Sequence, residues 1–383
     1  MLGHKRRDPR AGAFEGSRKG SRGGSRATSR ATRAATSRRG LQATSRVARA
    51  ATSRRDSRAA ILAVVLASAL AIFLAVSFVA REAQKARGAQ GPQGPEGRQP
   101  DQLVISLVGD IMLSRGVQTQ LDENGYDYPY EDVREVFLGD DLTVGNLECP
   151  ITERDSPASK TKRFLFRADL ENAAALKAAG FDCMNLANNH SMDCLNIGLS
   201  DTMRYLEESG LSYVGAAKDA ASHRPFVYEK NGIRVGILAY SAFPPEGFVY
   251  EQDKATVRYV STMDLAGMEQ EIGELDCDFK IVYFHWGIEY QPYKSDMQEQ
   301  IARKAIDSGA DFVVGAHPHV LQRAETYQGK HIYYSLGNFV FDRQVPPGTD
   351  ESMILQLTVG REGLLGVEEI PVTIERAKPV RNP

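Results

Sequence analysis

Short apolar runs recur along residues 102–376, and each is followed by polar residues. Six of these runs are four to six residues long, a length typical of buried strands, and they cover 103–108, 142–145, 183–187, 279–284, 312–316 and 331–335. Between them, apolar residues recur at helical spacing over 130–138, 170–179, 197–208, 263–275 and 297–308. This repeated order of strand, polar residue and helix predicts an α/β domain.

Two further stretches predict additional strands. Residues 226–240 contain the pair Asn231-Gly232, which favours the tight turn of a β-hairpin. Residues 353–374 have the pattern of strands on either side of Gly363. We therefore expect one large domain over 102–376, which is long enough to bury a single core.

Residues 59–80 form an apolar run of a different kind, because all 22 lack charge. As a helix this run would be about 33 Å long, enough to cross a bilayer core of about 30 Å. A cleaved signal peptide has a shorter apolar core, and a buried helix of a soluble domain is the competing interpretation. The run predicts a single transmembrane signal-anchor helix.

The charge is distributed very unevenly around this helix. Residues 1–58 hold 17 Lys and Arg against 3 acidic residues, whereas the rest of the chain holds 30 basic and 46 acidic residues. The basic segment is rich in Ser, Thr, Ala and Arg, so it cannot bury enough apolar surface to fold. A nucleic-acid-binding arm is the alternative for this segment, but we expect no specific nucleic acid. The positive-inside rule predicts a cytoplasmic, disordered tail on a single-pass protein of the cell membrane.

Residues 81–101 lead from the helix to the domain. Gly recurs at every third position over 88–97, a collagen-like pattern that is too short for a triple helix. We expect a polar, extended linker that holds an extracytoplasmic domain close to the membrane.

Five of the predicted strands end in side chains that can bind a divalent metal ion. These side chains are Asp110, Glu148, Asn189, His285, and the pair His317 and His319. The carboxyl ends of strands in α/β sheets are common ligand sites, and Asp, Glu, Asn and His suit hard to borderline divalent ions. Each residue taken alone is as well explained as a cap or a turn. Their recurrence predicts one shared metal site.

At these residues the chain resembles the CapA-type capsule or poly-γ-glutamate synthesis proteins, a branch of the calcineurin-like metallophosphoesterase superfamily. The resemblance covers roughly 104–342. It is carried by Gly109-Asp110, Asn146-Leu-Glu148, Ala187-Asn-Asn-His190 with Asp193, His285-Trp-Gly-Ile-Glu-Tyr290, Gly315-Ala-His-Pro-His319 and Tyr334-Ser-Leu-Gly-Asn-Phe339. It implies a four-layer α/β/β/α sandwich with metal ions at the strand ends.

The resemblance also implies a role for each candidate residue. Asp110 and His319 correspond to ligands of a first metal ion, and Glu148 stands at the position of the bridging carboxylate. The residues that correspond to ligands of a second ion are Asn189, His285 and His317. His190 corresponds to the proton donor beside the ligating Asn. The implied cofactor is one or two divalent ions per chain: Mn, Mg, Fe or Zn.

The chain departs from the superfamily pattern at two of these positions. The superfamily usually has a His two places after the first Asp, and this chain has Met112 there. A thioether is a poor ligand for Mn²⁺ or Mg²⁺, so three outcomes stay open: a weak first site, an empty first site, or a centre with a single ion. The bridging position holds Glu148 where Asp is usual.

Three cations near the first two strand ends are candidate substrate-binding residues: Arg115, Lys162 and Arg163. The last two belong to the run 160–167, in which cations and aromatic residues alternate as at an anion-binding edge. A solvated edge strand explains the same run equally well.

Two classes of function fit these observations. One is a membrane-anchored component of capsule or poly-γ-glutamate synthesis or export, which binds an anionic polymer and other membrane subunits of a synthesis complex. The other is a metal-dependent hydrolase that acts on a phosphoester or an amide. The residues Cys149, Cys183, Cys194 and Cys277 lack zinc-site spacing, and disulfides or buried thiols are both compatible with them.

Overall fold

The computed structural model describes residues 101–154, 162, 164–244, 254–343 and 345–382. The predicted cytoplasmic tail, membrane helix and nearly all of the linker lie outside these residues. Within the described ranges, no helix is both long and apolar enough to span a membrane. All of the described residues belong to one unit, Pro92–Pro383.

The first of two large sheets is built around β1 (Gln102–Ile111), whose neighbours differ in direction. On one side β2 (Leu142–Leu147), β3 (Cys183–Asn185) and β4 (Ser212–Val214) continue in parallel. On the other side β16 (Glu351–Gly360), β17 (Gly363–Glu375) and β18 (Lys378–Arg381) are antiparallel. A short strand, β15 (Asn338–Val340), pairs in parallel with the end of β1.

The second sheet has the order β12-β13-β10-β9-β7-β6. Its parallel centre consists of β7 (Ile233–Ser241), β9 (Phe279–His285), β10 (Phe312–Ala316) and β13 (Lys330–Tyr333). The edge strands β6 (Phe226–Lys230) and β12 (Glu325–Tyr327) are antiparallel. Two short ribbons complete the strands, β5 (Ala216–Ala217) with β8 (Thr256–Val257) and β11 (Leu321–Gln322) with β14 (Ser335–Leu336).

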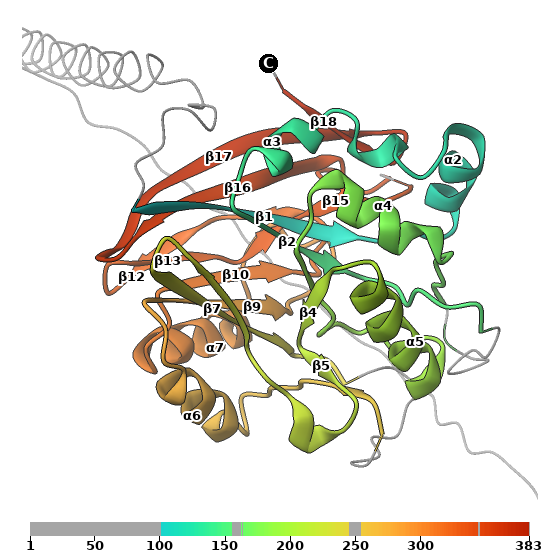
Figure 1. The fold of residues 1–383 in the computed structure, drawn as a ribbon. Helices are drawn as coiled ribbons and strands as arrows, with labels where there is room; N and C mark the ends of the chain where they lie inside the picture. The colour runs from blue at the N-terminus through green and yellow to red at the C-terminus, as the bar shows by residue number, and fades with distance from the viewer. Residues whose placement is uncertain (1–100, 155–161, 163, 245–253, 344, 383) are drawn as a thin grey trace, which may run out of the picture. The chain divides into compact units, whose positions relative to one another are not determined.

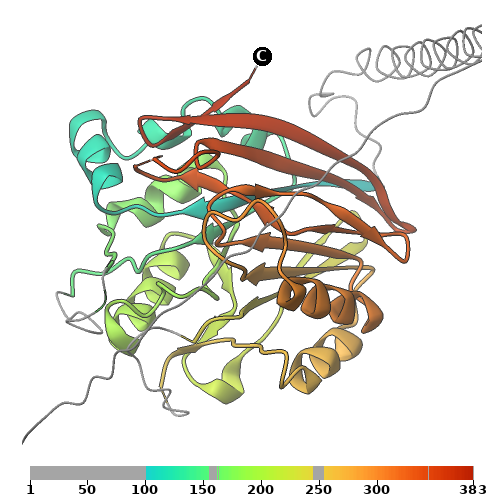
Figure 2. The ribbon, with the colours of Figure 1, turned by 180° about the vertical axis from the view of Figure 1, so that it is seen from behind.

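The two sheets pack face to face, and helices cover both outer faces (Figures 1 and 2). In β1, Leu103, Ile105 and Leu107 pack with residues of the second sheet such as Ile237 and Ile281 in one buried cluster. A second cluster lies beneath the helices of the first sheet, and a third lies between the second sheet and its helices. Three apolar layers of this kind separate four layers of secondary structure, in agreement with the expected α/β/β/α sandwich.

The helices beside the first sheet are α2 (Gly116–Asn124), α3 (Arg134–Leu138), α4 (Glu171–Ala179) and α5 (Leu195–Glu208). Those beside the second sheet are α6 (Ala266–Glu274) and α7 (Asp296–Asp307). The start of α7 is set by a capping box, in which Ser295 and Gln298 each satisfy the other's backbone N–H. Short 3₁₀ turns occur at Tyr128–Tyr130 and Ala220–Ser222.

Three sequence-based expectations need correction. The helix expected over 130–138 is only partly formed: Tyr130 ends the 3₁₀ turn Tyr128–Tyr130, which contains Pro129, and α3 begins only at Arg134. The strand expected over 331–335 is divided between β13 and β14. Helix α2 was not expected, since only Val117 and Leu121 of its residues are buried.

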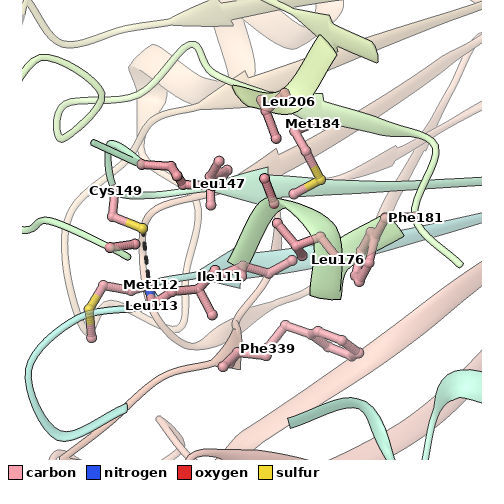
Figure 3. Close-up of a cluster of buried hydrophobic side chains, with 14 of the residues drawn as sticks. Ile111, Met112, Leu113, Leu147, Cys149, Leu176, Phe181, Met184, Leu206 and Phe339 are labelled. Carbon is pink, nitrogen blue, oxygen red and sulfur yellow. Dashed lines mark hydrogen bonds between the residues drawn. The ribbon is translucent and has the colours of Figure 1, made fainter. Parts of the chain in front are cut away.

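Met112 and Cys149 belong to the buried apolar cluster beneath the first-sheet helices (Figure 3). Met112 is a member of the cluster beneath the first-sheet helices, and its Sδ accepts the N–H of Ser114 at 3.3 Å. Cys149 Sγ accepts the N–H of Leu113 at 3.4 Å in the same cluster. No disulfide joins any of the four cysteines within the described residues, and three of them are buried while Cys277 is partly buried. Of the two alternatives that the sequence leaves open, the structure has thiols.

Candidate metal centre

The carboxyl ends of parallel strands from both sheets meet at one place. Asp110 lies at the end of β1, Glu148 follows β2, and His285 ends β9. The hydroxyl of Tyr283 in β9 donates to the carbonyl oxygen of Val108 in β1, which joins the two sheets two residues before Asp110. Side chains that lie far apart in the sequence therefore converge between the sheets.

One group of possible ligands consists of Glu148, His285 and His317, whose ligand atoms all lie within 4.8 Å of one another. His285 Nε2 lies 3.1 Å from His317 Nδ1 and 3.9 Å from Glu148 Oε1. Asn189 Oδ1 lies 2.9 Å from the same His285 nitrogen. The structure thus brings together the residues that the resemblance assigns to a second ion.

A second group consists of Asp110, Glu148 and His319. His319 Nδ1 lies 3.2 Å from Asp110 Oδ2, and Asp110 Oδ2 also accepts the backbone N–H of His317 at 3.1 Å. These are the residues that the resemblance assigns to the first ion. Glu148 belongs to both groups, which is the placement expected of a carboxylate that bridges two ions.

Glu148 is the most informative residue of the centre. Its side chain is fully buried, and within the described part of the chain neither carboxylate oxygen has a hydrogen-bond donor. Burial, followed by the negative charge of Asp110, raises the pKa of Glu148 well above its usual value. A buried carboxylate without donors is costly, and a bound cation is a partner that removes this cost.

The histidines of the centre have the protonation states that metal binding requires, with one exception. Burial and then the neighbouring imidazoles hold the pKa of His285 and of His317 well below the usual value, so both rings are neutral near pH 7. Burial also lowers the pKa of His319, but the carboxylates of Glu148 and Asp110 outweigh it and raise that pKa to about 9. A cation would have to displace this proton.

The backbone after β10 is bent in an unusual way to place two imidazoles. His317 has φ 97° and His319 has φ 58°, a left-handed region that costs a non-glycine residue roughly 1–3 kcal/mol. Pro318 lies between them, and the ring centroids of the two histidines are 5.8 Å apart. Backbone strain of this kind clusters at functional sites, and here it directs His317 and His319 into two adjoining ligand groups.

Asn146 links the two sheets behind the ligands. Its Nδ2 donates to Asp110 Oδ1 at 2.8 Å and contacts His285 Nδ1 at 3.2 Å. Its Oδ1 accepts from Asn185 and Asn188, both of which are buried. These two donors fix the amide orientation of Asn146, and the amide in turn holds a ligand candidate from each sheet in place.

His190 faces the centre with one ring nitrogen and a carboxylate with the other. Its Nε2 lies 4.0 Å from Glu148 Oε1, and its Nδ1 lies 2.8 Å from Asp193 Oδ2. Lys162 Nζ contacts Asp193, lies 3.3 Å from His190 Nδ1 and donates to the backbone oxygen of Asn189. The ring of Phe166 stacks on the imidazole at 4.0 Å. His190 is therefore held rigidly beside the candidate ligands.

Of the three predicted substrate-binding cations, two have intramolecular partners in the structure. The Lys162 side chain is only 3% exposed and is bound to Asp193. Arg115 pairs with Asp342, and its guanidinium lies 4.6 Å from the centre of the Phe166 ring. Arg163 lies outside the described residues. Lys162 and Arg115 are therefore held in place by contacts within the protein. Substrate binding by Arg115, Lys162 and Arg163 stays a prediction.

Aromatic rings pack against the imidazoles of His317 and His319. Phe243 lies 4.3 Å from His317, and Phe341 lies 4.9 Å from His319, measured between ring centroids. Both histidines are buried. This burial lowers the pKa of both imidazoles, and at His319 the carboxylates of Glu148 and Asp110 outweigh it.

Sequence reasoning missed three contributions to the centre, namely Asn146, Asn338 and the pairing of Lys162 with Asp193. Asn146 and Asn338 stand inside the motifs that carry the resemblance, and Asn338 follows the sixth predicted strand. Their positions at strand ends could have marked both residues as part of the site. The contact of Lys162 with Asp193 joins residues 31 apart in the chain, and no local pattern predicts it.

A cavity of about 260 Å³ lies elsewhere, between β7 and α6. Its described lining includes His223, Arg224, Arg258 and Glu271, and none of the candidate ligands belongs to that lining. The cavity and the candidate metal centre are therefore separate features of the domain.

Comparison with known proteins places these features in a family. Residues 104–343 match the model of the bacterial capsule synthesis protein PGA_cap. The chain is 34% identical to the PGA biosynthesis protein CapA of Bacillus subtilis, over 73% of each chain. It is 33% identical to the capsule biosynthesis protein CapA of Bacillus anthracis, over 74% of this chain and 70% of that one.

The likeness to solved structures is more distant. A putative 5′-nucleotidase from Staphylococcus aureus aligns with a TM-score of 0.43 and 15% identity, over 73% of this chain and 54% of that one. This value is too low to bear on function, whereas the family match covers most of the described domain. The chain belongs to the bacterial capsule synthesis protein family PGA_cap.

Proposed function

We propose that this protein takes part in the formation of a capsule or of poly-γ-glutamate, through a centre at its strand ends that binds one or two divalent ions. The names of its relatives, which describe PGA and capsule biosynthesis, support the process. The observation that carries the metal centre is Glu148, a buried carboxylate without hydrogen-bond donors that belongs to both ligand groups.

The donor set fits a hard to borderline divalent ion. Two carboxylates, an amide oxygen and three imidazoles surround the site, and no cysteine belongs to either ligand group. Such a set suits Mn, Mg, Fe or Zn. Asp110, Glu148 and His319 would hold one ion, and Glu148, Asn189, His285 and His317 would hold the other.

Around such an ion, this chain's own residues would orient an anionic group and exclude water. A divalent ion supplies Lewis-acid polarisation of a carbonyl or phosphoryl oxygen when it is bound. Phe243 and Phe341 keep solvent away from the ligand histidines, which strengthens the electrostatic interactions within the centre. This arrangement suits the recognition of a polymer that carries repeated carboxylates.

The anchoring of the protein is part of the proposal. The uncharged run 59–80 and the basic load before it support a cell-membrane protein with a cytoplasmic N-terminus and an extracytoplasmic domain. Its expected partners are poly-γ-glutamate or a similar anionic polymer and other membrane subunits of the synthesis complex. Arg115, Lys162 and Arg163 remain the candidate contacts to the polymer.

A second candidate function is hydrolysis of a phosphoester or amide, favoured by the geometry of His190. Asp193 holds the Nδ1 side of its ring at 2.8 Å, which leaves Nε2 directed at Glu148. An imidazole held in this way can deliver a proton to a leaving group. A His190→Ala variant that keeps its metal but loses hydrolysis of a screened ester or amide would favour this candidate. Equal hydrolysis by both proteins would dismiss it.

The role in polymer formation is tested by replacing the native protein in its host with the Glu148→Gln variant. This substitution keeps the shape of the side chain and removes its charge. We expect little or no surface polymer from these cells. Glu362→Gln is the matched control, because Glu362 is exposed on the turn between β16 and β17, and it should support a normal amount. Normal polymer from Glu148→Gln cells would contradict the proposal.

A further inference from the structure

Asn338 lies next to the candidate ligands, although neither ligand group includes it. It begins β15 and is paired in register with Asp110 of β1. The backbone N–H of Asp110 donates to the oxygen of Gly337 at 3.0 Å, which holds the two strands together at this point. Asn338 is 1% exposed. Its side chain is therefore an internal part of the centre.

The orientation of the Asn338 amide is fixed by its neighbours. Its Nδ2 donates to the backbone oxygen of Thr349 at 3.0 Å and to that of His319 at 3.4 Å. Because only the NH₂ side of an amide can donate, these two acceptors settle which side of the group is the oxygen. Oδ1 consequently points at His319 Nδ1, 2.9 Å away.

His319 Nδ1 then has the spacing of a neighbouring ligand from two oxygen atoms, one of Asn338 and one of Asp110. His319 Nδ1 lies 2.9 Å from Asn338 Oδ1 and 3.2 Å from Asp110 Oδ2. Neighbouring ligands of an octahedral ion, each about 2.1 Å from the metal, are about 3 Å apart. A single N–H on His319 cannot point well at both oxygens, whereas one cation can contact all three atoms.

A further ligand is needed here because Met112 cannot supply one to a hard ion. The Met112 Sδ accepts the N–H of Ser114 within the apolar cluster, and a thioether is a poor ligand for such ions. An amide oxygen is a good one. Asn338 is in register with Asp110, and the backbone oxygen of Val340 accepts the N–H of Met112. β15 therefore places Asn338 beside the strand end at which Met112 supplies no ligand.

We propose that Asn338 Oδ1 is a direct ligand of the ion held by Asp110, Glu148 and His319. This inference rests on the proposed metal centre and adds to it a ligand that the family resemblance does not assign. The first site then has four protein ligands, one of them an amide oxygen, as the second site has with Asn189.

Direct ligation is tested with the full chain in detergent, loaded with Co²⁺. A cysteine thiolate bound directly to Co²⁺ gives a near-ultraviolet charge-transfer band, whereas a residue that only orients a ligand gives none. Asn338→Cys should show this band at one Co²⁺ per chain. The unmodified chain and Asn172→Cys, a matched variant of a buried asparagine in α4, should not show it.

The alternative outcomes separate this inference from the centre on which it rests. Asn338→Cys that binds as many Co²⁺ ions as the unmodified chain without the band would overturn the ligand assignment alone. Failure of the unmodified chain to bind Co²⁺ would remove the centre itself. If Asn338→Cys does not fold, Asn338→Asp decides the question. Its carboxylate should hold the ion at least as tightly as the amide does, and loss of that ion would overturn the assignment.

Discussion

Glu148 combines full burial with a lack of hydrogen-bond donors among the described residues. In the metal-free protein its pKa is raised well above the usual value, first by burial and then by Asp110. The pKa of His319 is raised to about 9, because the two carboxylates outweigh the opposing effect of burial. The two groups act on each other, since only an ionised Glu148 raises the pKa of His319, and the proton held by His319 competes with a cation near neutral pH.

Metal binding should release the proton of His319 and become tighter as the pH rises. The sign follows from the raised pKa of His319, since the ion can enter only after this proton leaves. The gain in affinity should continue until the pH passes the folded-state pKa of His319. Calorimetric titrations in buffers of different ionisation enthalpy measure the release. An affinity that is constant between pH 6 and pH 9, without proton release, would contradict this account.

Loss of His317 and loss of His319 should have different consequences. His317→Ala removes an imidazole that lies beside His285 and Glu148, so binding at that site should be abolished. His319→Ala should matter less if Met112 has already weakened its site. Metal titration of the two variants tests this order. Equal and complete loss in both would indicate two interdependent ions, and undisturbed binding by His317→Ala would reject the metal site.

At the scale of elements, the strands that carry the ligands were predictable and several others were not. The runs 103–108, 279–284 and 312–316 fall within β1, β9 and β10, because a strand buried on both faces is a continuous apolar run. Strands of two or three residues, such as β5 and β11, are too short to show any periodicity. They form only because neighbouring segments offer hydrogen-bond partners.

The same limit applies to the site. Asp110, Glu148, His285 and His317 could each be recognised in the sequence, because each follows or ends a predicted strand. Parallel strands bring their carboxyl ends to one edge of a sheet, so these residues could be expected to lie together. The hydrogen bonds of Asn146, which join residues from both sheets, depend on the packing of one sheet against the other. Such contacts between distant segments leave no local pattern.

The junction of β1 with β15 should be sensitive to a single methyl group. A Cβ added at Gly109 would lie 1.9 Å from the backbone oxygen of Gly337, so Gly109→Ala must push the two strands apart beside Asp110. We expect a loss of about 1–3 kcal/mol in the free energy of unfolding, together with weaker metal binding. Denaturant titration and metal titration measure the two effects.

Gly366→Ala is the control for this substitution. Gly366 also lies in a strand of the first sheet, and an added Cβ would meet no atom within 4 Å. Its effect on both measurements should be small. If Gly109→Ala were as stable as this control and bound metal as well, the close approach of β1 and β15 would not be needed for either property.

At the scale of the whole molecule, the domain and the N-terminal segment have opposite charge. Residues 1–58 have a net charge of +14 and the remainder has −16. The reason to expect the tail inside the cell and the domain outside is narrower: seventeen basic residues precede the uncharged run 59–80, and only a handful follow it closely. An anionic domain would also repel an anionic polymer, which gives a bound divalent cation a direct role in holding one.

The topology is tested by adding protease to intact cells from which any outer barrier has been removed. The domain should be digested and the tail spared, because only residues after about 82 are exposed. Antibodies against each segment identify the surviving fragment. A protected domain would reverse the topology and with it the proposed localisation.

The central claim is that Glu148 is a carboxylate shared by two groups of metal ligands. The most direct test is the metal content of the purified full chain, measured by elemental analysis after removal of loosely bound ions. We predict one or two tightly bound divalent ions per chain, nearly complete loss of both in Glu148→Gln, and full retention in Glu362→Gln. A chain without bound metal that takes up none on titration, or a Glu148→Gln variant that keeps its full complement, would contradict the account.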